Sequence, residues 1–385
     1  MRRVVFWGSI GAIGYAYAGF PLLLCLRAVV APRPWTVHDR SQPSVTVVIA
    51  AHNEERAIAS KVRNVLDLDY PAELLDCVVV SDGSTDRTVE FARDVGSDRI
   101  TVLELPRNGK ATALNRGIGR ATGEILVFTD ANSRLADDAI TRLVAPFGDP
   151  DVGGVAGDQR YDDGVDASGE RAYWSFDRLL KVAESRAGNV ISATGALYAI
   201  RRELAVVVPE GVTDDFAIST GVIERGRRLV FEPRAIAFEP PAVKLGGEYR
   251  RKVRVMTRGL RSVYLRRRLL DPRLTGFYSL QLVSHKVIRR LVVVPLALAL
   301  WSSLSLRRRS PLYGLAALGQ LAVYGLGSAG LAASRARWTQ RRVVAIPAFF
   351  VLVNAASLNA LWNVVTGRRI DLWTPERSTL EDPRA

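Results

Sequence analysis

The chain has few cysteines and fewer acidic than basic residues. It contains two cysteines in 385 residues, Cys25 in an apolar stretch and Cys77 in an expected strand. This number excludes a disulfide framework and fits a reducing compartment. Asp and Glu total 39 against 53 Lys and Arg, for a formal net charge of +14. The basic excess lies beside apolar segments, which favours an anionic membrane surface over nucleic acid as its partner.

A convincing signal-peptide cleavage site is also missing. The apolar stretch Val4–Leu26 follows Met-Arg-Arg, as in a secretory signal, but Arg27 directly follows it. The stretch is long enough to span about 30 Å of hydrocarbon, so we expect a transmembrane anchor over residues 1–31. Three further apolar segments predict transmembrane helices over residues 291–369: Leu291–Leu306, Leu312–Ala333 and Val343–Val365.

Carboxylates stand where two apolar runs end. Cys77–Val80 leads into Asp82, and Ile125–Phe128 leads into Asp130. Buried parallel strands read as continuous Val/Ile/Leu runs, and ligands collect beyond their carboxyl ends. We therefore expect these side chains at the rim of a sheet, where they suit a nucleotide and a divalent cation.

The surrounding pattern alternates strands with helices. Val45–Ala51 is a third β-branched run, and helices are expected over Ala57–Leu66, Thr88–Val95 and Leu114–Ala121. Ser84 or Thr85 is the expected N-cap of the second helix. This order predicts βαβ units and an α/β domain with a mostly parallel sheet.

Five motifs in this order carry a resemblance to a known family. From Ser44 to about Arg268 the chain resembles the GT-A catalytic domain of membrane-bound family 2 glycosyltransferases, the group of the cellulose, hyaluronan and ceramide-glucose synthases. The matching segments are Ala51-His52-Asn53-Glu54-Glu55, Ser81-Asp82-Gly83-Ser84-Thr85-Asp86, Asn108-Gly109-Lys110-Ala111 with Ala113-Leu114-Asn115, Thr129-Asp130-Ala131-Asn132, and Thr213-Asp214-Asp215.

Asp130 and Asn132 are the expected metal ligands. Placed two apart on an extended segment, their side chains would point the same way. A carboxylate and an amide oxygen, completed by water and a diphosphate, suit Mg²⁺ or Mn²⁺. The family often has a second Asp where this chain has Asn132, so Asp130 is the principal ligand.

The resemblance assigns the donor nucleotide to the first two motifs and to Lys110. Asp82 and Asp86 resemble the base- and ribose-recognising loop, with Asn53 and Glu54 beside it. A turn and a helix cap are the alternative role of Asp86. Lys110 resembles a phosphate-binding lysine, with a solvated turn lysine as the alternative.

The resemblance places the general base in Thr213-Asp214-Asp215, and by position it is Asp215. Asp215 would take the proton of an acceptor hydroxyl as that oxygen attacks the anomeric carbon of the sugar, with inversion. A neighbouring charge on Asp214 should raise the pKa of Asp215, which suits proton abstraction near neutral pH. The alternative is that Thr213 or Asp214 is only the N-cap of a helix.

Two further segments match in part. Arg251 and Arg254 match the arginines of a Gln/Arg-x-x-Arg-Trp signature and would neutralise the donor diphosphate, but Val255 replaces the tryptophan. This departure weakens the expectation of a long polymer product. Gly195 lies in a small-residue segment that resembles the acceptor site, although a glycine there is equally a packing feature.

These observations predict a GT-A domain over residues 43–245, basic amphipathic interfacial helices over 246–290 and a tail over 370–385. We expect an inverting, metal-dependent enzyme that moves a sugar from a nucleotide-sugar, with UDP as the expected nucleotide, to a lipid or glycan. The alternatives are a processive polysaccharide synthase, a polyprenyl-phosphate sugar transferase and a non-catalytic subunit with partners in a glycan-export complex.

The expected location is the bacterial cytoplasmic membrane, with several spans and the catalytic domain in the cytosol. The topology stays open. Three C-terminal spans would put the tail outside, whereas Gly367-Arg368-Arg369 favours the cytosol. Either Val343–Val365 is re-entrant or Leu291–Leu306 does not span fully.

Overall fold

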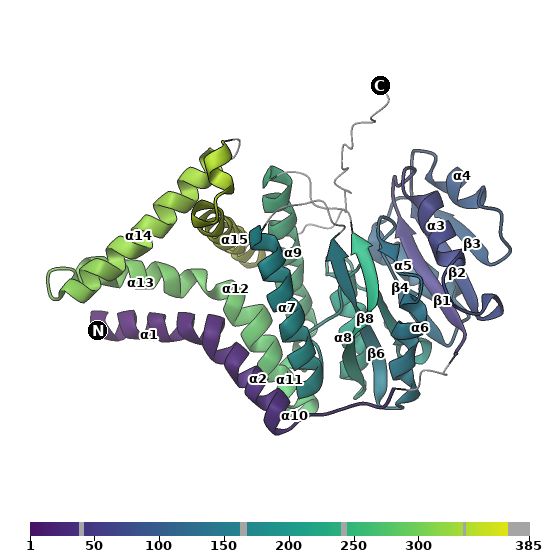
Figure 1. Ribbon diagram of the computed structural model, residues 1–385, viewed down its shortest axis with the longest axis horizontal. Coiled ribbons are helices and arrows are strands. Elements are labelled where there is room, and N and C mark those ends of the chain that lie inside the picture. The colour runs from purple at the N-terminus through teal and green to yellow at the C-terminus, as the bar shows by residue number, and fades with distance from the viewer. Residues whose placement is uncertain (38–41, 162–167, 240–244, 334–335, 369–385) are drawn as a thin grey trace.

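The computed structural model describes residues 1–37, 42–161, 168–239, 245–333 and 336–368. An α/β domain occupies one side of the molecule, and a group of long helices extends from the other (Figure 1). The helices α7 and α9 stand between the two parts (Figure 1). The predicted tail, residues 370–385, lies outside the described residues.

One eight-stranded sheet forms the centre of the α/β domain, in the order β3-β2-β1-β4-β7-β6-β8-β5. The strands β3, β2, β1 and β4 run parallel, as predicted, whereas β7 is antiparallel to both β4 and β6, and β5 to β8. The sheet is therefore mixed. Its strands are β1 (Val45–Ala51), β2 (Leu75–Asp82), β3 (Ile100–Leu105), β4 (Ile125–Phe128), β5 (Arg134–Leu135), β6 (Val152–Tyr161), β7 (Tyr198–Arg201) and β8 (Arg228–Glu239).

Both faces of the sheet are covered, which explains why β1 is apolar at nearly every position. Val47 packs in one core cluster and Val48 in the other, because successive side chains of a strand point to opposite faces. The helices of the α/β domain are α3 (Ile58–Leu66), α4 (Thr88–Arg93), α5 (Lys110–Arg120), α6 (Ala139–Val144), α7 (Ser168–Ala187) and α8 (Asp214–Glu224).

The predicted helices are present with shifted ends. The helix expected from Leu114 begins at Lys110, so Lys110 stands at a helix start rather than in a loop. The expected cap of α4 is wrong: Asp86 Oδ1, not Ser84 or Thr85, accepts the backbone N–H of Thr88 at 3.1 Å. An Asx turn therefore starts this helix.

The remaining helices form the second part of the molecule. α1, η1 and α2 run continuously over Arg2–Val30, and this stretch, α14 and α15 are each long and apolar enough to cross a membrane. The helices are α1 (Arg2–Gly14), η1 (Tyr15–Gly19), α2 (Phe20–Val30), α9 (Leu245–Leu265), α10 (Pro272–Thr275), α11 (Phe277–Leu282), η6 (Val283–Ile288), α12 (Arg289–Leu291), α13 (Val293–Leu306), α14 (Pro311–Ala332) and α15 (Arg342–Val365). Short 3-10 turns complete the described chain: η2 (Ala72–Leu74), η3 (Ala145–Gly148), η4 (Arg202–Leu204), η5 (Arg267–Leu270) and η7 (Arg337–Gln340).

The segment expected to span over Leu291–Leu306 differs from the other three. Its helix α13 has 14 residues and bends by 49° from the preceding helical stretch Phe277–Leu291. At 1.5 Å per residue α13 covers roughly 21 Å, less than the hydrocarbon thickness. The preceding stretch packs on the α/β domain, where Tyr278 Oη donates to the carbonyl oxygen of Ile191 at 2.7 Å.

The basic helix α9 has a packed face. Met256 and Thr257 contact Ser357 and Asn363 of α15 through hydrogen bonds of 3.3 Å each. The interfacial position of this helix at a membrane stays a prediction, since only its exposed face is available to lipid.

Candidate active site

The parallel strands bring three predicted motifs to one edge of the sheet. β2 ends at Asp82, β1 at Ala51 just before Asn53, and β4 at Phe128 just before Asp130. Because β1 pairs in parallel with both β2 and β4, their carboxyl ends meet at the same rim. The first turns of α5 and α8 complete this rim.

The centre of the site is an ammonium group held between two carboxylates. Lys110 Nζ lies 2.7 Å from Asp130 Oδ1 and 3.0 Å from Asp214 Oδ2. Burial alone would lower the pKa of Lys110, but the two carboxylates hold it above its usual range. Lys110 thus connects β4, α5 and α8, and it is not the solvated turn lysine of the alternative interpretation.

Asp215 follows on the first turn of α8. Its Oδ1 accepts the backbone N–H of Phe216 at 2.6 Å. Burial and then the charge of Asp214 raise the pKa of Asp215 to about 6, while Lys286, the Phe216 N–H and Lys110 oppose the increase. A carboxylate with this pKa is ionised near neutral pH and can accept a proton there.

Asp82 holds the loop that carries Lys110. Its Oδ1 accepts the backbone N–H groups of Asn108 at 2.7 Å and of Gly109 at 2.9 Å. Gly109 has φ of 92°, a left-handed conformation that favours glycine. The Asp82 carboxylate therefore fixes the start of α5, and contact with the donor nucleotide stays a prediction for it.

The loops after β1 and β2 are tied together next to Asp82. Asn53 Oδ1 accepts the backbone N–H of Thr85 at 2.8 Å, and the N–H of Glu54 donates to Thr88 Oγ1 at 2.8 Å. Asp86 bonds Thr88 and also accepts the N–H of Glu55 at 3.3 Å. The structural alternative for Asp86 is present, and donor contacts for Asn53, Glu54 and Asp86 stay predictions.

The extended backbone expected for Asp130 and Asn132 is wrong, whereas their roles as metal ligands stay predictions. The chain does not continue as an extended strand after β4: it turns, and the N–H of Ser133 bonds the carbonyl oxygen of Asp130 at 3.3 Å. Asn132 lies exposed in this turn. The two side chains therefore lack the common direction that an extended segment would give them.

Asp130 can supply one ligand of a divalent cation. Among the described residues, no group of three or more His, Cys, Asp or Glu side chains could hold a metal. Asp130 offers a hard carboxylate, and a Cβ at Gly195 would lie 2.8 Å from its Oδ2, so only glycine leaves that oxygen room. A cation here would need diphosphate oxygens and water for its remaining ligands.

The sequence analysis did not identify four residues that lie near this site. Lys61 Nζ donates to Thr129 Oγ1 at 2.8 Å and to the Ser133 carbonyl at 2.7 Å, behind the Asp130 turn. Burial lowers the pKa of Lys61 to about 7, against the opposing charge of Asp130. The position of this lysine on the apolar face of α3, beside Ile58 and Val62, could have indicated a buried polar role from the sequence.

Tyr198, Glu239 and Lys286 are the other three. Tyr198 stacks on Phe128 with ring centroids 4.9 Å apart, and its buried hydroxyl has no hydrogen-bond partner among the described residues. Burial and then Asp130 raise the pKa of Glu239 to about 7, and Arg251 opposes this increase. Asp130 and the predicted diphosphate ligand Arg251 thus both act on the Glu239 carboxylate. Arg254 is half-buried further along α9.

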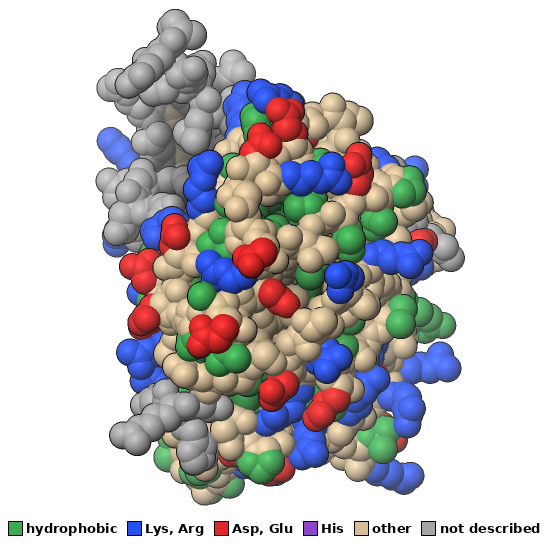
Figure 2. All heavy atoms as spheres, turned by 90° about the vertical axis from the view of Figure 1, so that its right-hand side faces the viewer, with side chains coloured by type: hydrophobic (Ala, Val, Ile, Leu, Met, Phe, Trp, Pro, Cys, Tyr) green, Lys and Arg blue, Asp and Glu red, His purple; other side chains and the backbone are tan. Residues whose placement is uncertain are grey.

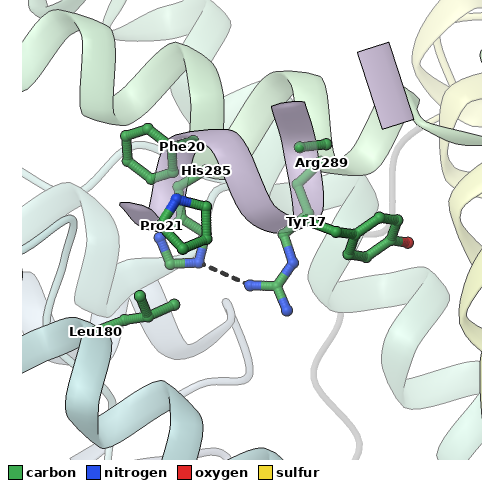
Figure 3. Close-up of a pocket in the computed structure, with 7 residues that line it drawn as sticks. Tyr17, Phe20, Pro21, Leu180, His285 and Arg289 are labelled. Carbon is green, nitrogen blue, oxygen red and sulfur yellow. Dashed lines mark hydrogen bonds between the residues drawn. The ribbon is translucent and has the colours of Figure 1, made fainter. Parts of the chain in front are cut away.

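A small pocket lies outside this site. It is lined by Tyr17, Phe20 and Pro21 of the N-terminal helices, by Leu180 of α7, and by His285 and Arg289 (Figure 3). None of the predicted site residues lines it. The carboxylate rim, not this pocket, is therefore the candidate active site.

The surface over the α3–α4 side of the sheet shows no basic patch. Lys and Arg side chains alternate there with Asp and Glu (Figure 2). The net positive charge is therefore not concentrated on this face, and the absence of a nucleic-acid partner stays a prediction.

Comparison with known proteins identifies the domain. Residues 46–207 match glycosyl transferase family 2. A poly-beta-1,6-N-acetyl-D-glucosamine synthase of Staphylococcus aureus (strain COL) is 30% identical over 220 residues, which are 54% of this chain and 53% of that protein. The Staphylococcus epidermidis synthase is 28% identical over 221 residues, with the same shares. The chain thus spans about half the length of the curated relatives it matches.

A solved structure matches over nearly the whole chain. A mannosyltransferase from Pyrobaculum calidifontis, in complex with GDP-Man and Mn²⁺, has a TM-score of 0.72 and 25% identity, covering 96% of this chain and 100% of that one. The match includes the helical part as well as the sheet. Residues 46–207 therefore match glycosyl transferase family 2, and the chain has a GT-A-like fold.

Proposed function

We propose that the protein is an inverting glycosyltransferase that moves a sugar from a nucleotide-sugar to a hydroxyl group of a lipid or glycan at a membrane. The observation that carries this proposal is the placement of Asp215. A half-buried carboxylate with a pKa of about 6 stands on the helix turn that Lys110 ties to Asp130, at the ligand-binding edge of the sheet. A protein that only binds nucleotide has no need of such a base.

Asp215 takes the proton of the acceptor hydroxyl in this reaction. The acceptor oxygen forms a bond to the anomeric carbon while the bond from that carbon to the diphosphate oxygen breaks. Attack on the face opposite the leaving group inverts the configuration. Lys110 and Arg251 supply positive charge where negative charge grows on the departing nucleotide diphosphate, which is where electrostatic stabilisation has its largest effect.

The proposal includes a divalent cation, with Asp130 as one of its ligands. When bound, Mg²⁺ or Mn²⁺ would stabilise charge on the diphosphate. The Pyrobaculum structure with Mn²⁺ supports this assignment, since it matches the chain over nearly its full length. Lys110 Nζ and a cation would share the Asp130 carboxylate, so we expect Lys110 to move toward the diphosphate when both ligands bind.

A polymer-forming reaction is the second candidate. The similarity to poly-beta-1,6-N-acetyl-D-glucosamine synthases favours it. Val255, 44% exposed on α9, stands where the polysaccharide-synthase signature has tryptophan, and this favours one or a few transfers instead. The nucleotide has two candidates as well: UDP from the motifs, and GDP from the Pyrobaculum complex.

The test uses membranes that contain the full chain, incubated with labelled UDP- and GDP-sugars and either Mg²⁺ or Mn²⁺. We expect label in the organic-extractable lipid or short-glycan fraction, and a loss of about 100-fold or more in Asp215→Asn. The matched control Asp151→Asn removes a carboxylate that is 73% exposed and should retain full activity.

Each outcome separates the candidates. Label in an insoluble fraction supports the polymer-forming reaction. Activity that survives Asp215→Asn points to a phosphate acceptor, which needs no strong base, as in a polyprenyl-phosphate sugar transferase. No incorporation from any donor, with a folded protein and a range of acceptors, contradicts catalysis and favours a non-catalytic subunit of an export complex.

A further inference from the structure

Lys286 reaches the candidate active site from the helical part of the molecule. It lies in η6, the π-helical stretch Val283–Ile288 between α11 and α12. Its Nζ stands 5.6 Å from the centroid of the Phe216 ring, and Phe216 is the residue whose N–H binds the Asp215 carboxylate. A residue 71 positions away in sequence from Asp215 is thereby placed beside the proposed base.

The neighbouring residue fixes the orientation of this stretch. His285 Nδ1 lies 2.8 Å from Glu184 Oε1 of α7, and its Nε2 lies 3.0 Å from an Nη atom of Arg289 (Figure 3). Glu184 is buried, and its Oε2 accepts the N–H of Ile191 at 3.1 Å. With His285 bound to α7, the next side chain, Lys286, reaches α8. Such π-helical turns are rare and occur frequently at functional sites.

The ammonium of Lys286 has no ion pair within 4 Å among the described residues. Arg290 of α12 faces it with like charge, and the carboxylates of Glu184 and Asp177 of α7 and of Asp215 attract it. Glu184 is already bound by His285, and Asp177 lies 3.5 Å from Lys181. Among the described residues, Asp215 is therefore the carboxylate in this group that forms no hydrogen bond or ion pair with another cationic side chain.

Charged side chains from three elements interact electrostatically with Asp215. Asp214 of its own helix repels a negative charge on it, while Lys286 of η6 and Lys110 of α5 attract it, and the phenol of Tyr198 on β7 lies nearby. Lys110 already forms ion pairs with Asp130 and Asp214. Lys286 is therefore the cationic side chain near the base that forms no ion pair with another carboxylate among the described residues.

We propose that Lys286 is a positioning residue that keeps the Asp215 carboxylate ionised, and that the bent helix stretch Phe277–Leu291 delivers it to the site. The proposal rests on the proposed role of Asp215 as general base. It makes the base dependent on correct docking of this helical stretch against the catalytic domain. Burial and Asp214 would otherwise favour the protonated carboxyl, which cannot accept a proton.

The experiment measures kcat/KM against pH for the wild-type chain and for Lys286→Met, Lys286→Gln and Lys286→Arg. The positive charge of Lys286 lowers the pKa of Asp215, so its removal should raise that pKa. We therefore expect the acid limb to move to higher pH in the Met and Gln variants. For a shift of about one unit, the loss should approach tenfold well below pH 6 and be small above pH 8. Lys286→Arg should restore the wild-type profile.

The matched control is Lys252→Met. Lys252 also stands over an aromatic ring, 4.9 Å from the centroid of Phe349, and is also half-buried, but its ring partner belongs to α15 and not to α8. Its profile should keep the wild-type acid limb. A merely structural role for Lys286 predicts an equal loss at every pH, and that result would overturn the proposal.

Asp215→Asn separates this proposal from the proposed function. If Asp215→Asn is inactive and the acid limb is the same in Lys286→Met and wild type, the role of Lys286 is wrong and that of Asp215 stands. If Asp215→Asn keeps its activity, the proposed base itself is wrong. If Lys286→Met does not fold, Lys286→Gln and the arginine rescue decide the question.

Discussion

Asp214 and Asp215 illustrate how adjacent identical residues take different roles. Asp214 is paired with Lys110 at 3.0 Å, whereas Asp215 lies half-buried next to that pair with a pKa of about 6. The charge of Asp214 raises the pKa of Asp215, so Asp214→Asn should shift the acid limb of kcat/KM to lower pH. Activity of the wild type should rise with pH through about 6, where Asp215 ionises.

The control for this prediction is Asp214→Glu, which keeps the charge. It should leave the limb near its wild-type position, although its activity can fall through the altered contact with Lys110. An acid limb that moves upward in Asp214→Asn would contradict the assignment, because the loss of a neighbouring negative charge cannot stabilise the protonated form of Asp215.

Gly195 gives a second prediction at the residue scale. A Cβ at this position would lie 2.8 Å from Asp130 Oδ2, so Gly195→Ala must displace the carboxylate. We expect activity to fall by about tenfold or more, since misplacement by about 1 Å of a substrate-positioning group can cost that much. Gly119→Ala is the matched control: that glycine is in α5 and has open space around it, so activity should be unchanged and the helix slightly stabilised. Equal activities of the two variants would remove Gly195 from the site.

At the scale of elements, the sequence predicted what is local. β1, β2 and β4 read as apolar runs because both faces of the sheet are covered, and the parallel arrangement brought Asp82 and Asp130 to one rim as expected. β5, with two residues, is too short for a periodic signal. Lys286 and Glu239 could not be placed from sequence, because packing between distant segments brings them to the site. The turn at Asp130 was not predicted, because the expected strand was continued beyond Phe128, the last residue of β4.

The packing of α14 on α15 depends on two small residues. A Cβ at Gly327 would lie 2.5 Å from the carbonyl oxygen of Pro347, and a Cβ at Gly330 2.8 Å from Val344 Cγ1. Small residues let helices approach closely where no hydrophobic effect drives their association. Gly327→Val should therefore lower the temperature at which the detergent-solubilised chain aggregates, by several degrees. Gly319→Val and Gly325→Val, in open space on the same helix, should not. The same decrease in all three variants would indicate a loss of helix propensity instead.

The whole molecule combines an α/β domain with a helical part that exposes many apolar side chains. Side chains such as Val4, Leu22 and Val343 are 75%, 70% and 75% exposed, far from what a water-soluble surface of this composition would carry in contiguous patches. Three helices have the length and hydropathy of membrane spans, while α13 is too short to cross unaided. Two modes of membrane attachment follow: insertion through these helices, or adsorption through the basic face of α9.

The two modes of attachment differ in their sensitivity to salt. Adsorption depends on charge and weakens when the Debye length falls to about 3 Å at 1 M salt, whereas insertion rests on the removal of apolar surface from water. We expect the chain to stay in the membrane pellet after 1 M NaCl and after alkaline carbonate, and to be released by detergent. Leu315→Arg and Leu22→Arg, at exposed positions of the candidate spans, should reduce insertion, since a charge at the bilayer centre costs about 2.5–3.5 kcal/mol. Adding the same charge at Ser305, beside Arg307 at the end of α13, should have little effect. Release of the wild-type chain by salt alone would show that the helices lie against protein or on the membrane surface, and that α9 carries the attachment.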